Sequence, residues 1–283
     1  MVARLAYSLG WALTSAEAEK GARSNNPDAI DLTMQGWALF WRDFPKPPNE
    51  RRESVKQARA LFNRALAINP NDADALAGSA LTYYEEDFNG WTDPKPDYEA
   101  KILGQADRAI ALDPNNARAY MPKALYLSDM SGRYTEALGV ADAGLAINPN
   151  FVLLFGPRIL AENALGRFEQ AKVDAERLMR LSPRDPLIGL FHVFAGEAES
   201  SLGHFDAAID EYHKAIDSGF RPFFAYADVA AAYAHAGRME EAKTALAEAR
   251  RLNPKLTVKW MIEHTSNLPA VFDGLRKAGL PEE

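Results

Sequence analysis

The stretch GRFEQA at residues 166–171 recurs along this chain with small changes. Its relatives are GRYTEA at 132–137, GHFDAA at 203–208 and GRMEEA at 237–242. The four glycines that open these stretches stand 34, 37 and 34 residues apart. Self-similarity at a period of this size is typical of solenoids, in which each repeat packs mainly on its neighbours.

Each recurring stretch lies between two segments that have the composition of helices, and the second segment ends in a proline box. Proline lacks an N–H and restricts the residue before it, so it marks a helix end. The Asn or Asp that follows can cap the next helix. The pattern therefore predicts a helical hairpin as the repeating unit. The boxes are INPND (68–72), LDPNN (112–116), INPN (147–150), LSPRD (181–185) and LNPK (252–255).

Small and large residues keep the same register in successive hairpins. The second helices repeat a small–large–small pattern, and the first helices repeat a single small position. Small residues are needed where two helices approach closely, and large residues fill the space between them. Examples are Ala58, Phe62 and Ala65, which correspond to Ala208, Tyr212 and Ala215, and the first-helix residues Gly36, Ala80, Gly196 and Ala230.

This pattern resembles the tetratricopeptide repeat, in about six copies over residues 27–254. The resemblance implies an all-α fold: a right-handed superhelical solenoid of about six helical hairpins with capping helices. We expect residues 1–26 to form an N-terminal helix and residues 255–283 to form helices that cover the last hairpin.

The first two repeats carry long inserts, near residues 42–53 and 86–98. Both contain Pro-Lys-Pro, within FPKPPNE (44–50) and TDPKPDYE (92–99). Proline-rich polar segments are poor helix interiors, so we expect loops that project between the paired helices. Two interpretations stay open: functional loops on a rigid scaffold, or inert insertions that a solenoid tolerates.

Composition excludes several classes of function. The chain has 283 residues, a net charge of −7 and no cysteine. Its acidity disfavours nucleic acid as a partner, and the lack of cysteine excludes disulfides and thiolate chemistry. The apolar segment 223–236 is shorter than the roughly 18–20 residues of a membrane span and contains Asp228. We expect a cytoplasmic protein without a membrane span.

No catalytic or metal-binding motif is present. None of the five histidines has a metal-ligand spacing such as H-E-x-x-H, and the chain contains no phosphate-binding glycine loop and no G-x-S-x-G. We therefore predict that the protein is not an enzyme and has no cofactor, metal or catalytic residue.

The resemblance places the first helices on the concave side of the superhelix, where a partner would bind. The N-terminal half of this concave side carries aromatic residues, whereas the C-terminal half carries small or polar residues, including Glu197. Exposed aromatic clusters are typical of partner sites. The alternative is that Trp37, Trp41 and Tyr84 pack under the inserts. The predicted groove residues are Trp37, Phe40, Trp41, Leu81, Tyr84, Tyr126, Met130 and Asn163.

A second resemblance concerns the larger protein context. DAIDLTMQGWALFW (28–41) and the C-terminal residues 252–283 resemble the C-terminal repeat region of bacterial class III adenylate/guanylate cyclase-like proteins. The resemblance implies a sensing or scaffolding part of a signalling protein, without the cyclase activity itself.

Two functions follow as hypotheses. The first is a non-catalytic scaffold whose groove binds a peptide or partner helix, with homodimerisation left open. The second is a sensor that binds a small ligand in the aromatic N-terminal half of the groove.

Overall fold

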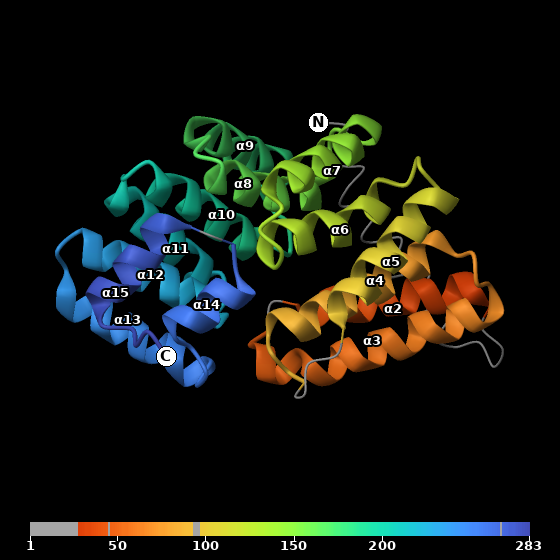
Figure 1. The fold of residues 1–283 in the computed structure, drawn as a ribbon, viewed down its shortest axis with the longest axis horizontal. Helices are drawn as coiled ribbons and strands as arrows, with labels where there is room; N and C mark the ends of the chain where they lie inside the picture. The colour runs from red at the N-terminus through yellow and green to blue at the C-terminus, as the bar shows by residue number, and fades with distance from the viewer. Residues whose placement is uncertain (1–27, 45, 93–96, 267) are drawn as a thin grey trace.

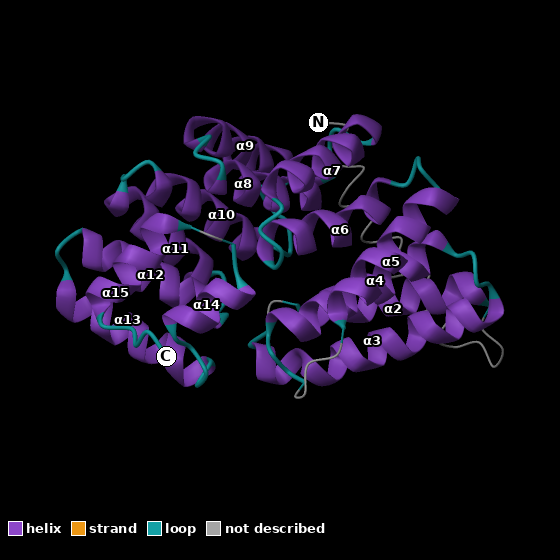
Figure 2. Cartoon of the chain, viewed as in Figure 1, coloured by secondary structure: helices purple, strands orange, loops and turns teal. Residues whose placement is uncertain are grey.

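The computed structural model describes residues 28–44, 46–92, 97–266 and 268–283. Within these residues the chain is helical and contains no strand (Figure 2). The predicted N-terminal helix, residues 1–26, lies outside the described part. Six hairpins follow one another: α2 (Ala29–Asp43) with α3 (Pro48–Ile68), α4 (Ala73–Phe88) with α5 (Tyr98–Leu112), α6 (Ala117–Asp129) with α7 (Tyr134–Ile147), α8 (Phe155–Ala164) with α9 (Phe168–Leu181), α10 (Ile188–Ser201) with α11 (Phe205–Asp217), and α12 (Phe223–His235) with α13 (Met239–Leu252).

A short 3-10 helix, η1 (Val152–Leu154), precedes α8, and α14 (Val258–His264) and α15 (Pro269–Ala278) follow the last hairpin. Figure 1 shows the hairpins arranged in an arc, with α15 packed beside α12. The predicted all-α solenoid of six hairpins with capping helices is confirmed. No helix in the described ranges is long and apolar enough to cross a membrane.

The glycine that opens each recurring stretch ends the first helix of its hairpin. Gly132, Gly166, Gly203 and Gly237 all have φ between 67° and 77°, a left-handed conformation that glycine adopts without a Cβ clash. In the fourth hairpin the Arg167 N–H then donates to the Glu162 carbonyl at 2.8 Å, which satisfies a carbonyl at the helix end.

The predicted small–large register is the contact between neighbouring helices. The Phe62 ring of α3 is fully buried against Gly36 of α2 and Gly78 of α4. A Cβ on Gly78 would lie 2.3 Å from Phe62 Cζ, so only glycine leaves room for the ring. The same arrangement recurs in the fifth hairpin, where Gly196 faces Tyr212.

The first insert is mostly helix, so the prediction of a projecting loop over 42–53 is wrong for most of that range. Helix α2 continues to Asp43, and α3 begins at Pro48 and has 21 residues, against 13–15 in the other second helices. Proline is tolerated in the first turn of a helix because its missing N–H has no partner there. In the range 86–98, α4 runs to Phe88, and loop is described only for residues 89–92 and 97.

The lengthened first helices reach across the superhelix to the C-terminal hairpins. Phe44, directly after α2, stacks on Phe220 with ring centroids 6.1 Å apart. Phe88, at the end of α4, meets Phe224 of α12 edge-on at 5.9 Å. These aromatic contacts join the two ends of the arc, and therefore enclose the concave side between them.

Candidate functional site

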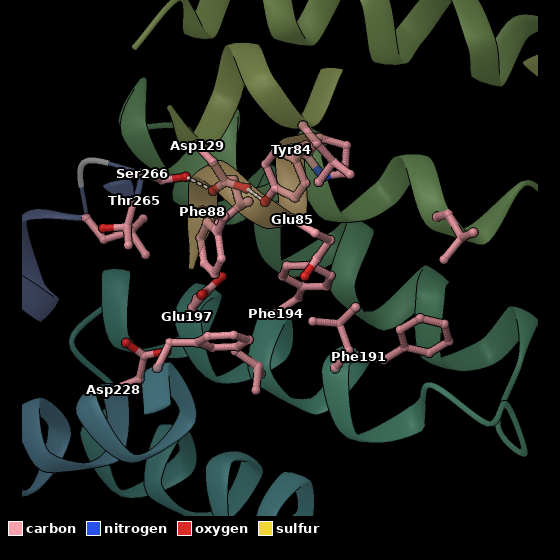
Figure 3. Close-up of a pocket in the computed structure, with 18 of the residues that line it drawn as sticks. Tyr84, Glu85, Phe88, Asp129, Phe191, Phe194, Glu197, Asp228, Thr265 and Ser266 are labelled. Carbon is pink, nitrogen blue, oxygen red and sulfur yellow. Dashed lines mark hydrogen bonds between the residues drawn. The ribbon is translucent and has the colours of Figure 1, made fainter. Parts of the chain in front are cut away.

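An apolar cavity of about 110 Å³ lies on the concave side of the superhelix. Its walls come from the first helices of all six hairpins and from the C-terminal segment. Figure 3 shows how carboxyl side chains project among the aromatic rings of this cavity. Residues from the first hairpin and from the C-terminal part of the chain form the cavity together: Trp41 and Phe44 line it, as do Phe224 and Phe272.

The structure separates the predicted groove residues into different environments. Trp41, Leu81 and Tyr84 line the cavity. Trp37 and Phe40 are buried in the N-terminal core, where Trp37 stacks on Trp41 with ring centroids 6.3 Å apart. Trp41 in turn packs against Phe44 of the first insert, with ring centroids 5.3 Å apart, which is the packing that the alternative interpretation describes. The aromatic partners of Trp37 lie outside the inserts. Trp37 is therefore not available to a partner in this conformation.

The remaining three predicted residues lie elsewhere. Tyr126 is buried at the end of α6, and burial raises its pKa to about 12, with a further contribution from Glu99. Asn163 is buried on α8, and neither polar atom of its side chain has a hydrogen-bond partner among the described residues. Met130 lines a second hollow described below.

A hydrogen-bonded group of three side chains holds the C-terminal segment against α6. Asp129 accepts a hydrogen bond from the Tyr84 hydroxyl at 2.5 Å and one from the Ser266 hydroxyl at 2.6 Å. Figure 3 shows both bonds. Burial raises the pKa of Asp129 to about 6, although the two hydroxyl donors oppose the shift. Because Ser266 lies between α14 and α15, these bonds fix the segment that covers the cavity.

Glu85 is paired with a cation. Arg51, from the helical first insert, contacts the Glu85 carboxylate at 2.8 Å, and both side chains are buried. Burial raises the pKa of Glu85, and the Arg51 charge opposes that rise. Arg51 also donates to the Phe44 carbonyl at 3.1 Å, so the pair anchors the end of α2.

Two further carboxyls line the cavity without a cation. Glu197 on α10 and Asp228 on α12 are 7% and 3% exposed. Oε2 of Glu197 has no hydrogen-bond partner among the described residues. Burial raises the pKa of both groups, and the nearby Asp228 and Asp129 carboxyls add to the shift at Glu197. Such groups often mark functional sites, because an unpaired buried carboxyl is otherwise costly.

Sequence reasoning had a weak signal for these two residues. It placed Glu197 on the concave side by its register, and it treated Asp228 only as a charge that interrupts an apolar segment. Neither residue belongs to a motif, so their meeting in one cavity depends on the curvature of the superhelix.

A wider hollow of about 580 Å³ adjoins the cavity at the surface. Asp129, Thr265 and Phe272 line both spaces, so the hollow and the cavity are neighbours that share a wall. Met130, Tyr134 and the exposed Ile262 form its outer wall. In the described part of the chain, no group of three or more His, Asp or Glu side chains is arranged to hold a metal ion.

Paired helices in this register define the fold as a tetratricopeptide-repeat solenoid, and solved structures agree. The chain is similar to TTC0263, a thermophilic tetratricopeptide-repeat protein of Thermus thermophilus, with 22% identity over 72% of this chain and 98% of that chain (TM-score 0.53). No family model matches the sequence.

Two larger proteins share the arrangement. Human IFIT1, in a structure with PPP-AAAA, is 21% identical over 78% of this chain and 49% of that chain (TM-score 0.61). Cut9, in the APC/C hetero-tetramer Cut9–Hcn1, is 15% identical over 95% of this chain and 52% of that chain (TM-score 0.65). The match thus spans about half the length of IFIT1 and Cut9. At these identities the likeness establishes the fold alone.

Proposed function

We propose that this protein is a non-catalytic binding module whose site consists of the cavity and the adjoining hollow. One observation carries the proposal: a surface hollow and an apolar cavity inside the superhelix have Asp129, Thr265 and Phe272 in common in their walls. Apolar cavities with a few convergent polar groups are the usual form of a binding site. The occupant is a segment of a partner protein, which lies in the hollow and inserts one side chain into the cavity.

A small ligand is the second candidate, and the closure of the superhelix favours it. The contacts of Phe44 with Phe220 and of Phe88 with Phe224 enclose the cavity from the N-terminal side. A partner helix therefore has no open groove along the first two hairpins, whereas a small molecule needs no groove.

The charge of the site argues against a nucleic-acid occupant. The IFIT1 structures contain PPP-AAAA or m7Gppp-AAAA, and polyphosphates require cations in their binding sites. Here Glu85, Asp129, Glu197 and Asp228 line the cavity, and the lining cation Arg51 is already paired with Glu85.

The larger context stays a prediction. The resemblance of residues 28–41 and 252–283 to cyclase-associated repeat regions makes a signalling enzyme one partner that this proposal accommodates. A cytoplasmic location and homodimerisation likewise stay predictions. Upstream sequence that encodes a cyclase domain would support the signalling role.

Site-specific photocrosslinking tests the proposal. A photoreactive amino acid in place of Met130 should crosslink the partner in cells, because Met130 lines the hollow. The matched control carries the same group at Val173, which is exposed on α9, distant in sequence from the hollow-lining residues. Adding Leu160→Trp, which fills the cavity, should abolish the crosslink from position 130 while leaving the helical circular dichroism unchanged.

The outcomes separate the two candidates. A crosslink from position 130 that Leu160→Trp removes supports a partner segment in the site. Identical products from positions 130 and 173 would contradict it. A small-ligand site would instead give no specific crosslink, but a thermal shift with a metabolite that Leu160→Trp abolishes.

A further inference from the structure

The cavity combines apolar walls with carboxyls that lack a counterion. Among the described residues that line it, Arg51 is the one cation, and its contact with Glu85 at 2.8 Å neutralises that carboxylate. Asp129 receives two hydroxyl donors. Glu197 and Asp228 therefore remain as acceptors that face the cavity without a cation.

The buried oxygen of Glu197 gives independent support for a ligand. Oε2 of Glu197 has no hydrogen-bond partner among the described residues, although the side chain is more than nine-tenths buried. Figure 3 shows Glu197 and Asp228 near each other beside Phe88, and electrostatic repulsion between their carboxyls agrees with that placement. Buried polar groups are usually satisfied, so an oxygen of this kind indicates a missing donor.

We propose that the cavity recognises a primary ammonium group on a short apolar stem, with the ammonium bound between Glu197 and Asp228. The inference rests on the proposed function and specifies the chemistry of its occupant. An ammonium supplies three donors and a positive charge, and the aromatic rings around the carboxyls attract cations through their faces. The ammonium comes either from a lysine side chain of a partner or from a free amine.

The volume of the cavity limits the stem. The cavity of about 110 Å³ is somewhat smaller than the engineered cavity of about 150 Å³ that holds benzene. A chain of about four carbons fits this space, and four methylenes are also the stem of a lysine side chain. Longer or branched amines would have to displace Phe194 or Phe224.

Because the carboxyls of the site titrate, the affinity for an ammonium should depend on pH. Burial raises the pKa of Glu197 and Asp228, so the empty cavity holds protons that an ammonium would displace. The other titratable groups that face them are Asp129 on α6 and Tyr212 on α11, with the neutralised Glu85 further along the wall. Binding should therefore release protons and should tighten between pH 6 and pH 9, because an alkylammonium keeps its charge below pH ~10.

Calorimetry with matched probes tests the inference on the full chain. n-Butylamine should bind at pH 8 at least tenfold more tightly than 1-butanol, which has the same stem without the charge. Glu197→Gln and Asp228→Asn should each weaken butylamine binding at least tenfold and leave butanol binding unchanged. The surface variant Glu240→Gln is the control, since that side chain is 89% exposed. Thermal melts verify that every variant folds.

Each outcome has a distinct meaning. Equal affinity for amine and alcohol, or amine binding that both variants leave unchanged, would overturn the ammonium inference while the cavity remains a site. Absence of binding by either probe would overturn the cavity as a ligand site and with it the proposed function. An acetylated, amidated pentaglycine with lysine at its centre distinguishes the sources: its binding indicates a partner lysine, and binding of butylamine alone indicates a free amine.

Discussion

Single glycines determine how closely neighbouring helices of this solenoid pack. Gly78 of α4 faces the ring of Phe62, which is also in contact with Gly36 on its other side. The ring is fully buried. In contrast, a Cβ on Gly104 of α5 would meet nothing within 4 Å. The two glycines have the same helical backbone but opposite packing requirements.

Gly78→Ala should lower the free energy of unfolding by about 1–3 kcal/mol, because the new methyl overpacks the Phe62 contact. Gly104→Ala is the matched control and should raise it by up to about 1 kcal/mol through helix propensity. Both variants gain the same propensity, so their difference in urea unfolding isolates the clash. Equal stabilisation by the two substitutions would show that Phe62 moves without cost.

Sequence reasoning predicted the aromatic residues of the inner wall but not their roles. The register identified Trp41, Leu81 and Tyr84, which line the cavity. It could not distinguish them from Trp37, because burial depends on neighbours from other helices, such as Phe62 of α3. Trp37 is 2% exposed, so Trp37→Ala would report on core packing rather than on binding.

At the scale of elements, the capping helices and the inserts cooperate to close the superhelix. Helix α15 lies on α12 so closely that a Cβ on Gly274 would stand 2.6 Å from the Ala231 carbonyl oxygen. Val271 and Phe272, on the same helix, line the cavity. The cap therefore completes the site as well as covering the last hairpin.

Gly274→Ala should displace α15 from α12, because the new methyl group would meet the Ala231 carbonyl oxygen. That oxygen belongs to the backbone and cannot rotate away. We expect amide hydrogen exchange in α15 to accelerate at least tenfold, with α2–α5 unaffected. Arg276→Ala, on the exposed side of α15, serves as the comparison and should change exchange little, because its side chain pairs with Glu282 and not with α12. If both variants behave alike, the close approach of α15 and α12 does not hold the cap in place.

The elements themselves were largely predictable from sequence. Glycine turns and proline boxes define helix ends through local backbone chemistry, so the hairpins could be placed without the fold. The first insert could not be placed in this way, because Pro48 occupies the first position of α3, where proline is compatible with a helix. Composition alone does not distinguish a first-turn proline from a loop.

At the scale of the whole molecule, curvature brings together carboxyls that are far apart in the chain. Asp129, Glu197 and Asp228 come from three hairpins and line one cavity. No short motif encodes this meeting, since it depends on the angle between successive repeats and on the closure by Phe44 and Phe88. For this reason the sequence predicted the fold well and the chemistry of the cavity poorly.

The contact of the C-terminal segment with α6 also makes the free energy of unfolding depend on pH through Asp129. Its pKa is about 6 in the folded protein, above the value of about 3.9 expected for an unfolded chain. The folded state thus holds the proton more tightly, so this group contributes stability that is fully present below pH ~4 and is lost as the pH rises through about 6. The difference of about 2 units corresponds to about 3 kcal/mol.

Asp129→Asn should remove this dependence, because the amide stays neutral and its oxygen still accepts a hydroxyl hydrogen bond. Relative to the wild type, the free energy of unfolding of the variant should rise by about 2 kcal/mol between pH 4.5 and pH 7.5 in urea unfolding. Comparing the two proteins at each pH cancels the contributions of the surface ion pairs. A stability difference that stays constant across this range would mean that Asp129 titrates as an ordinary carboxyl, and that the contact between Ser266 and α6 does not exclude water.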